Sequence, residues 1–427
     1  MRIKVLPEDF SVRELIDLPM LKEGQYALYR VRKRGIDGIL LQKRIAQALG
    51  VSPSKVILPA LKDSRAIALQ YFSVGPLRKP PRAVSGAGFE AELVGFSARH
   101  LSPRDLRGNR FRITVRDLPR EGLRSLKEAW EKLSRRGFPN YFDLQRFGSW
   151  SPEGGFPGKA LIKGEWEKVL RFYLLYPLLG EGVKVRSFKA AAKDLWGDWP
   201  KLKERCPRSN LRSVLTFLCD HPRAFKKAVN LITPRILSLW LSAYQSYLWN
   251  EVVSRLLQRA FEEGSVKFTY IELPFQKLTV AVGNLPEGLS SQLSGIELPL
   301  PTARMKPEGP LGEVLLEVLE AEGLALEDLR AKGLKRAYLG RSRRRLWIRL
   351  LSPLWGGEGE DELYPGKGKV TLEFTLPPGT YATMALKVLG VLSGLGPVRG
   401  SEKVPEGLDR VEGLLGDLDE DREPAGH

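Results

Sequence analysis

Histidine and cysteine are scarce in this chain. Its 427 residues include three histidines and two cysteines, Cys206 and Cys219. Two cysteines are too few for a disulfide scaffold. A zinc site needs His or Cys ligands at suitable spacing, and the run Cys219-Asp220-His221 is too cramped for the usual arrangements. With few histidines and no GxSxG motif, the sequence gives no support for a Ser-His-Asp hydrolase either.

Phosphate-binding glycine loops and long apolar runs are also missing. Neither GxxxxGK[ST] nor a GxGxxG between strand and helix occurs, so we expect no metal and no small-molecule cofactor. The opening MRIKVLPEDF lacks the charged segment and apolar core of a signal peptide. The most apolar stretch, residues 229–248, is broken by Pro234, Arg235 and polar residues, and is too mixed to span a bilayer. We therefore expect a soluble cytoplasmic protein with no membrane partner.

Positive charge is what the chain has in excess. Lys and Arg number 68 against 50 Asp and Glu, which gives a net charge of +18. Residues 401–427 hold nine acidic and three basic side chains, so the rest of the chain is more basic still. Such a balance favours a polyanion such as nucleic acid, because each neutralised phosphate releases condensed counterions. The charge-rich surface of a thermostable protein is the alternative explanation.

One segment combines this charge with aromatic rings. Residues 334–350, LKRAYLGRSRRRLWIRL, interleave seven Lys or Arg with Tyr338 and Trp347. Basic groups could hold backbone phosphate, and the rings could stack on bases or on arginine planes. A solvated helix face or strand edge is the competing interpretation. The candidate nucleic-acid contacts in this segment are Lys335, Arg336, Arg343, Arg344 and Arg345.

The hydrophobic pattern predicts an α+β protein with two domains. Strand-like runs occur at residues 25–33 and 66–74, twice within residues 86–118, and at residues 369–376. Helical periodicity occurs at residues 39–49, 123–137 and 382–389, and it dominates from about residue 151 to residue 340. Strands separated by helices, with hairpin-like returns, indicate a mixed and largely antiparallel sheet rather than a doubly wound parallel one.

A Lys62-Asp63 pair follows an apolar run at residues 56–58 that is typical of a buried strand. A carboxylate beside an ammonium is held charged, which makes Asp63 a candidate nucleophile or base. A surface turn is the commoner reason for an isolated Lys-Asp dipeptide. The wider pattern, with Ala66 and Gln70 after it, is similar to the KDxxAxTxQ signature of the TruD family of pseudouridine synthases. In that family the aspartate is the catalytic residue.

Other segments resemble the same family, and they follow in the family's order. PEDF at residues 7–10, with Lys4 six residues before Phe10, resembles the opening segment, and GNRF at residues 108–111 resembles a GNxF strand entry. NYFDLQRFG at residues 140–148 is close to NYFGxQRFG, with Asp143 in place of a glycine. LSAYQSYLWNEV at residues 241–252 and LPPGTYATMALKVL at residues 376–389 resemble the two C-terminal segments. The resemblance therefore covers nearly the whole chain.

The resemblance implies an enzyme that isomerises uridine to pseudouridine in tRNA, with uridine 13 as the family's usual target. It implies that Asp63 is the catalytic carboxylate and that Lys4 is the cation that keeps it ionised. Lys62 is then expected to shape the turn or to meet RNA. Arg146 could pair with phosphate or hold its own loop. The substrate-binding residues implied by the family motifs are Phe10, Asn140, Phe142 and Tyr381.

The resemblance also implies a domain organisation. A catalytic domain of pseudouridine-synthase type would comprise residues 1–150 and 341–397, with a mainly helical TRUD domain inserted at residues 151–340 and an acidic, flexible tail at residues 398–427. The expected partner is tRNA, and we expect a monomer or weak oligomer. The alternatives are a synthase for a different RNA, a non-catalytic RNA-binding protein on the same fold, and a carboxylate-dependent hydrolase. The hydrolase would need clustered acids for metal ions, and Asp63 stands alone in its segment.

Overall fold

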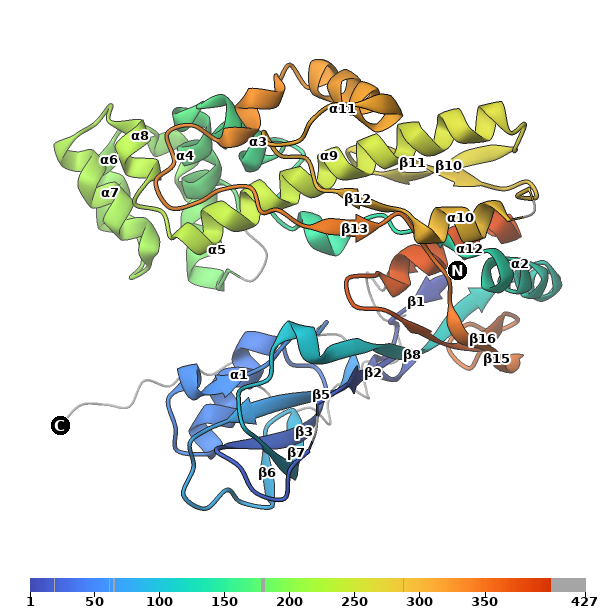
Figure 1. Ribbon diagram of the computed structural model, residues 1–427. Helices are drawn as coiled ribbons and strands as arrows, with labels where there is room; N and C mark the ends of the chain where they lie inside the picture. Colours follow the sequence, from blue (N-terminus) through green and yellow to red (C-terminus); the bar gives the residue numbers. More distant parts are fainter. Residues whose placement is uncertain (19, 61, 64–65, 178–180, 287, 401–427) are drawn as a thin grey trace. The chain divides into compact units, whose positions relative to one another are not determined.

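The computed structural model describes residues 1–400 except 19, 61, 64–65, 178–180 and 287 (Figure 1). It forms two compact units: Met1–Arg136 with the described part of Arg349–His427, and Gly137–Ile348. Most of the acidic tail expected at residues 398–427 lies outside the described residues. Across the part of the chain that is described, none of the helices has the length and apolar character of a membrane span.

A mixed sheet is the basis of the first unit. Its strand order is β15-β16-β8-β2-β5-β3-β7-β6, with β1 beside β8 and β17, and β4 beside β5. Along this order β2 and β5 run parallel, whereas the other described neighbours run antiparallel. The predicted fold class is therefore confirmed. The strands are β1 Arg2–Ile3, β2 Phe10–Ile16, β3 Tyr26–Lys33, β4 Val56–Ile57, β5 Ile67–Val74, β6 Ala83–Gly86, β7 Phe89–Ser97, β8 Leu106–Leu118, β15 Leu351–Glu360, β16 Gly368–Leu376 and β17 Arg399–Gly400.

Helices of the first unit pack on apolar side chains of the sheet. The Asp37 carboxylate accepts hydrogen bonds from the backbone N–H groups of Ile39 and Leu40, at 2.8 and 2.9 Å, and so begins the first helix. Trp130 packs on Phe374 of β16, with 5.8 Å between ring centroids. The predicted helices after Asp37 and before Gly137 are confirmed. The three helices are α1 Gly38–Ala48, α2 Gly122–Arg136 and α12 Ala382–Ser393.

The opposite face of the sheet carries charge. Successive side chains of a strand point to opposite faces, so Arg30 and Arg32 of β3 point away from buried Val31. They pair across the strands with glutamates of β7: Arg30 with Glu92, and Arg32 with Glu90 at 3.2 Å. Exposed pairs of this kind contribute little to stability, about 0–1 kcal/mol each. Because charged side chains cover it, this face of the sheet can be exposed to solvent.

Helices dominate the second unit. Its long helix α9 runs beside α3 and α11, and the hairpin of β10 and β11 packs against α9 (Figure 1). The helices are α3 Pro157–Lys163, α4 Trp166–Leu175, α5 Val183–Ala191, α6 Trp199–Arg205, α7 Asn210–Asp220, α8 Phe225–Val229, α9 Pro234–Glu263, α10 Leu289–Gly295 and α11 Gly309–Ala321. The strands are β9 Phe138–Pro139, β10 Phe268–Leu273, β11 Gln276–Ala281, β12 Glu297–Pro299, β13 Arg343–Arg345 and β14 Trp347–Ile348.

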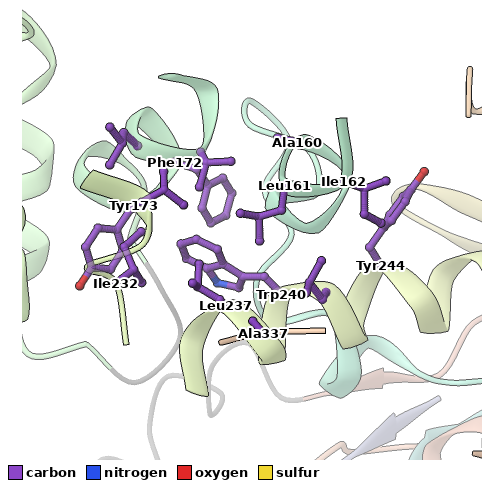
Figure 2. Packing of buried hydrophobic residues seen from close by; sticks show 14 of the residues in the cluster. Ala160, Leu161, Ile162, Phe172, Tyr173, Ile232, Leu237, Trp240, Tyr244 and Ala337 are labelled. Carbon is purple, nitrogen blue, oxygen red and sulfur yellow. The ribbon is translucent and has the colours of Figure 1, made fainter. Parts of the chain in front are cut away.

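Trp240 of α9 lies at the heart of the second unit's core. Figure 2 shows its indole beside Leu161 of α3 and Phe172 of α4. The rings of Trp240 and Phe172 meet edge to face, with 5.5 Å between centroids. Gly158 permits the close approach of α3, because a Cβ there would lie 2.3 Å from the carbonyl oxygen of Trp240. The second unit therefore has a hydrophobic core of its own.

Candidate active site

The parallel pairing of β2 and β5 brings distant segments of the first unit together. Ser11 of β2 lies opposite Ile67 of β5, near the first residue of each strand. In parallel strands the chain enters at the same end of the sheet. The segment before β2 contains Lys4, and the segment before β5 contains Asp63, so both reach this end.

Lys4 and Asp63 form a salt bridge there, in which the Lys4 ammonium donates to Oδ2 of Asp63. The ammonium also lies 4.4 Å from the ring centroid of Phe10, a favourable cation–π distance. Phe10 is buried and packs edge to face on Phe111. Lys4 has a φ of 57°, in the left-handed region that costs a non-glycine residue free energy. The fold thus constrains Lys4 to face the carboxylate.

A second lysine holds the backbone of the Lys62-Asp63 turn. Lys33, at the end of β3, is fully buried, and its ammonium donates to three carbonyl oxygens. Two belong to the turn, those of Asp63 at 2.6 Å and Lys62 at 3.2 Å, and the third is that of Ile36 at 2.7 Å. Burial lowers the pKa of Lys33 to about 8, against the attraction of Asp63 and Asp37. Lys33 therefore fixes the turn without facing outward.

Lys62 points to a different set of partners. Its ammonium pairs with Glu14 of β2 at 2.9 Å and donates to the side-chain oxygen of Asn109 of β8 at 2.6 Å. Burial raises the pKa of Glu14, against the attraction of Lys62, and its other oxygen accepts from the backbone of Tyr71 at 2.9 Å. Lys62 thus ties the turn to β2 and β8, which is the first of the two roles expected for it.

Lys33 and Glu14 were not singled out from the sequence, although a signal was there. Every second side chain of a strand points to the same face, and Lys33 lies two residues after the buried Val31 of β3. Glu14 likewise follows Val12 in the buried phase of β2. A charged residue at an inward position is buried only with partners. Both residues could therefore have been predicted, from this alternation, to support a functional site.

Tyr381 lies in the same unit, directly before α12. The preceding strand β16 ends at Leu376, which pairs with Asn109 of β8. The side chain of Asn109 accepts the hydrogen bond from the Lys62 ammonium. Gly108 is required at this pairing, since a Cβ there would lie 2.7 Å from the carbonyl oxygen of Leu376. Tyr381 is partly buried. Its expected role in the substrate pocket stays a prediction.

Asn140 and Phe142 belong to the second unit. The Asn140 amide donates to the carbonyl oxygen of Arg345 at 3.0 Å and accepts from the Arg344 guanidinium at 2.8 Å. That guanidinium also stacks on Phe142, with 3.9 Å to the ring centroid. Both residues are largely buried, and Phe142 meets Trp249 edge to face. Arg344, expected to contact RNA, is thus engaged within the protein, and it orders the two residues expected to bind substrate.

Arg146 faces the helix α9. Its Nε donates to the hydroxyl of Ser246 at 2.9 Å, and its guanidinium lies 5.6 Å from the Phe142 ring centroid. These contacts favour the loop-holding role over a phosphate contact. The neighbouring Asp143 has a φ of −105°, and its carboxylate accepts from the backbone of Leu144 at 2.7 Å. The position that carries glycine in the family motif therefore does not need glycine here.

The remaining basic candidates are exposed. Lys335 and Arg336 lie in a loop, whereas Arg343 and Arg345 lie on β13 and both contact Glu297 of β12. Trp347 is 1% exposed, so the interpretation that its ring stacks on bases is wrong. The pairing of β14 with β9 places this ring in the interior. Of the two aromatic rings in residues 334–350, Tyr338 alone is open to solvent, at 77% exposure.

Comparisons with known proteins identify relatives that match nearly the whole chain. The model of the family described as tRNA pseudouridine synthase D (TruD) matches residues 1–389. A probable tRNA pseudouridine synthase D 2 of Methanocaldococcus jannaschii is 32% identical, with 91% of each chain covered. The tRNA pseudouridine synthase D of Aquifex aeolicus is 28% identical over 91% of this chain and 97% of its own.

A solved structure has the same fold. It is the crystal structure of the putative tRNA pseudouridine synthase D (TruD) of Methanosarcina mazei, with a TM-score of 0.65 and 26% identity. The match covers 92% of this chain and 94% of the other. The predicted resemblance is confirmed, and the chain belongs to the TruD family of tRNA pseudouridine synthases.

Proposed function

We propose that this chain isomerises uridine 13 of tRNA to pseudouridine, with Asp63 as the catalytic carboxylate. The observation that carries the proposal is the salt bridge of Lys4 with Asp63 at the shared end of β2 and β5. The side chains are 11% and 24% exposed, so the pair is sheltered while the carboxylate retains access to solvent. A partly exposed anion held by fixed partners is suited to reaction with a bound nucleotide.

The reaction moves uracil from an N-glycosidic to a C-glycosidic bond. The bond between N1 and C1′ breaks, a bond between C5 and C1′ forms, and the proton lost from C5 is balanced by one gained at N1. A carboxylate can start this sequence by attack on the sugar, by attack on the base or by removal of a proton. Each of these steps needs the ionised form of Asp63, which the Lys4 ammonium stabilises.

The target nucleotide has to leave its stack before this carboxylate can reach it. We infer that Phe10, Asn140, Phe142 and Tyr381, the residues implied by the family motifs, contact the flipped uridine. The rings of Phe10 and Phe142 each carry a cation on one face, Lys4 in the first case and Arg344 in the second. Cations fixed on these rings favour a neighbouring base and its phosphate.

Two alternatives are less well supported. A non-catalytic RNA-binding protein would need the basic surface, but it would not need a carboxylate fixed by Lys4 with its turn held by Lys33 and Lys62. A metal-dependent hydrolase would need several carboxylates together. Within the described residues, no group of three or more His, Cys, Asp or Glu side chains is placed to hold a metal ion.

We also infer the organisation in which the enzyme works. Residues 1–150 and 341–397 would form the catalytic domain, and residues 151–340 the inserted TRUD domain. The enzyme would act in the cytoplasm as a monomer or weak oligomer, and without a cofactor, because the isomerisation consumes neither an energy source nor a redox partner.

The target nucleotide is tested by mapping. Purified protein is incubated with an unmodified tRNA transcript and a chelator, and pseudouridine is located by chemical adduct formation and primer extension. We expect a single stop at uridine 13 and none in a transcript with cytidine at that position. Product at another uridine would replace the proposed target, and no product from any tRNA tested would overturn the proposed activity.

Lys4→Met tests the cation of the salt bridge. Without the ammonium the carboxylate loses its charged partner, so we expect the acid limb of the pH–rate profile to move to higher pH. Single-turnover rates of pseudouridine formation, measured across the pH range, report this shift. Lys55→Met, on an exposed lysine of the same unit, serves as the control. An unmoved acid limb in Lys4→Met would contradict the assigned role.

A further inference from the structure

The second unit contains a cavity that the proposed reaction does not use. It has a volume of about 790 Å³ and lies among the loop after β12, the end of the 3-10 helix Leu326–Arg330 and the loop before β13. Its polar lining includes Arg304, Arg330, Arg341 and the ring of Tyr338. A smaller cavity shares Arg304 and Arg341 with it and adds Arg343. Cavities of this size commonly take a small ligand.

Charge in this cavity is unbalanced. Its lining contains Arg304, Arg330 and Arg341, and no aspartate or glutamate. Among the described residues none of these three guanidinium groups forms an ion pair, although arginines elsewhere in the unit do, as Arg259 does with Glu317. Arginines that gather without a counter-ion repel one another, and a bound anion relieves that repulsion. The cavity is therefore suited to an anionic ligand from outside the protein.

Tyr338 adds a surface of a different kind. Its side chain is 77% exposed, the highest exposure among the large apolar and aromatic residues of the described chain. Nucleobases stack on such rings in single-stranded nucleic acids, and stacking tolerates any base. Arginine matches phosphate through paired N–H groups. A nucleotide offers both a phosphate and a base, so it satisfies the arginines and the ring together.

We propose that this cavity binds one unpaired nucleotide of the tRNA away from the target uridine, with its phosphate on Arg330 and Arg341 and its base on Tyr338. The proposal rests on the proposed function for its RNA. Its site is separate, because Arg330, Arg341 and Tyr338 are not among the residues assigned to the reaction. In this proposal the second unit positions the tRNA, so these side chains affect tRNA binding and not the chemical step.

Affinity for an unmodified tRNA transcript tests the proposal. In Arg330→Gln and Arg341→Gln we expect the Kd to rise about 10-fold each, and the dependence of log Kd on log salt to lose about 0.7–0.9 per arginine. Tyr338→Ala should weaken binding about 10-fold, whereas Tyr338→Phe keeps the ring and should bind as wild type does. At saturating tRNA, kcat should stay within about twofold of wild type, so the loss appears in KM.

Arg124→Gln is the charge-matched control, because Arg124 is 90% exposed on α2 and pairs only locally with Glu128. It should change the Kd less than about twofold. Thermal unfolding checks that each variant folds. Equal affinities for Arg341→Gln and Arg124→Gln would overturn the proposal and leave an acidic peptide as the candidate ligand. Binding is also measured in the Asp63→Asn background, so failure of the proposed reaction and failure of this site give different results.

Discussion

Asp63→Asn should abolish pseudouridine formation, with a loss on the order of 10⁴-fold or more in the single-turnover rate. Asparagine has the shape of aspartate, but it carries no negative charge and cannot serve as the nucleophile or base. Every first step open to this site requires that charge. The rate is measured with excess enzyme on an unmodified tRNA transcript, so that slow product release does not hide the chemical step.

Binding should survive the same change. Asp63 pairs with Lys4 and is not a phosphate ligand, so we expect the Kd for tRNA to stay within about threefold of wild type. Asp17→Asn is the matched control, since Asp17 is an exposed carboxylate of the same unit that pairs with Arg107. It should keep the wild-type rate. If Asp63→Asn formed product at the wild-type rate, the carboxylate would have no part in the chemistry.

Lys33→Met should lower kcat about 10²-fold, because a misplacement of about 1 Å at the reacting group has an effect of that size. Methionine fills similar space but donates no hydrogen bond to the carbonyl oxygens of Asp63, Lys62 and Ile36. Lys33 acts through the position of Asp63, so KM should change little. Steady-state kcat and KM, together with the unfolding temperature, measure the effect.

Two further variants separate positioning from stability. Lys189 is also fully buried, and it pairs with Glu181 at 2.7 Å in the second unit. Lys189→Met should lower the unfolding temperature and leave kcat unchanged. Lys33→Gln retains two N–H donors and should recover part of the lost activity. A loss of stability in Lys33→Met with unchanged kcat would reduce Lys33 to a structural residue.

The pH dependence of Lys33 gives a second test. With its pKa at about 8, the wild-type ammonium loses a proton above pH 8, and the neutral amine has two N–H groups for three carbonyl oxygens. The pKa in the folded protein lies below the ordinary 10.5, so the unfolded chain binds more protons between these values and this group's contribution to stability rises with pH there. Activity should therefore fall above pH 8 while the contribution of Lys33 to stability rises.

Much of the fold could be predicted from the sequence because local patterns carry it. Alternation marked β3 and β8, and the Asp37 cap marked the start of α1. The resemblance to the family implied the joint role of Lys4 and Asp63. Their contact depends on the parallel register of β2 with β5, in which Ser11 lies opposite Ile67. Such a register is a non-local pairing that no local pattern contains.

The basic segment at residues 334–350 shows where sequence reasoning fails. Its seven Lys and Arg look equivalent along the chain, yet Arg344 binds Asn140 and Phe142 within the protein while Arg341 lines a cavity. Trp347 is buried by β14 and β9, whereas Tyr338 is open to solvent. Tertiary packing decides whether each of these side chains faces the interior, a cavity or solvent. That packing depends on partners far away in the chain.

The interruption of the first unit between Arg136 and Arg349 has a consequence for synthesis of the protein. β8 is made before the second unit, but its neighbour β16 is made after it. At usual elongation rates the ribosome needs roughly 10–40 s to make the intervening chain. During that interval the edge of β8 that later receives β16 is unpaired, and an open strand edge can pair with another chain. Nascent chains stopped within the second unit should therefore aggregate more readily than the finished protein.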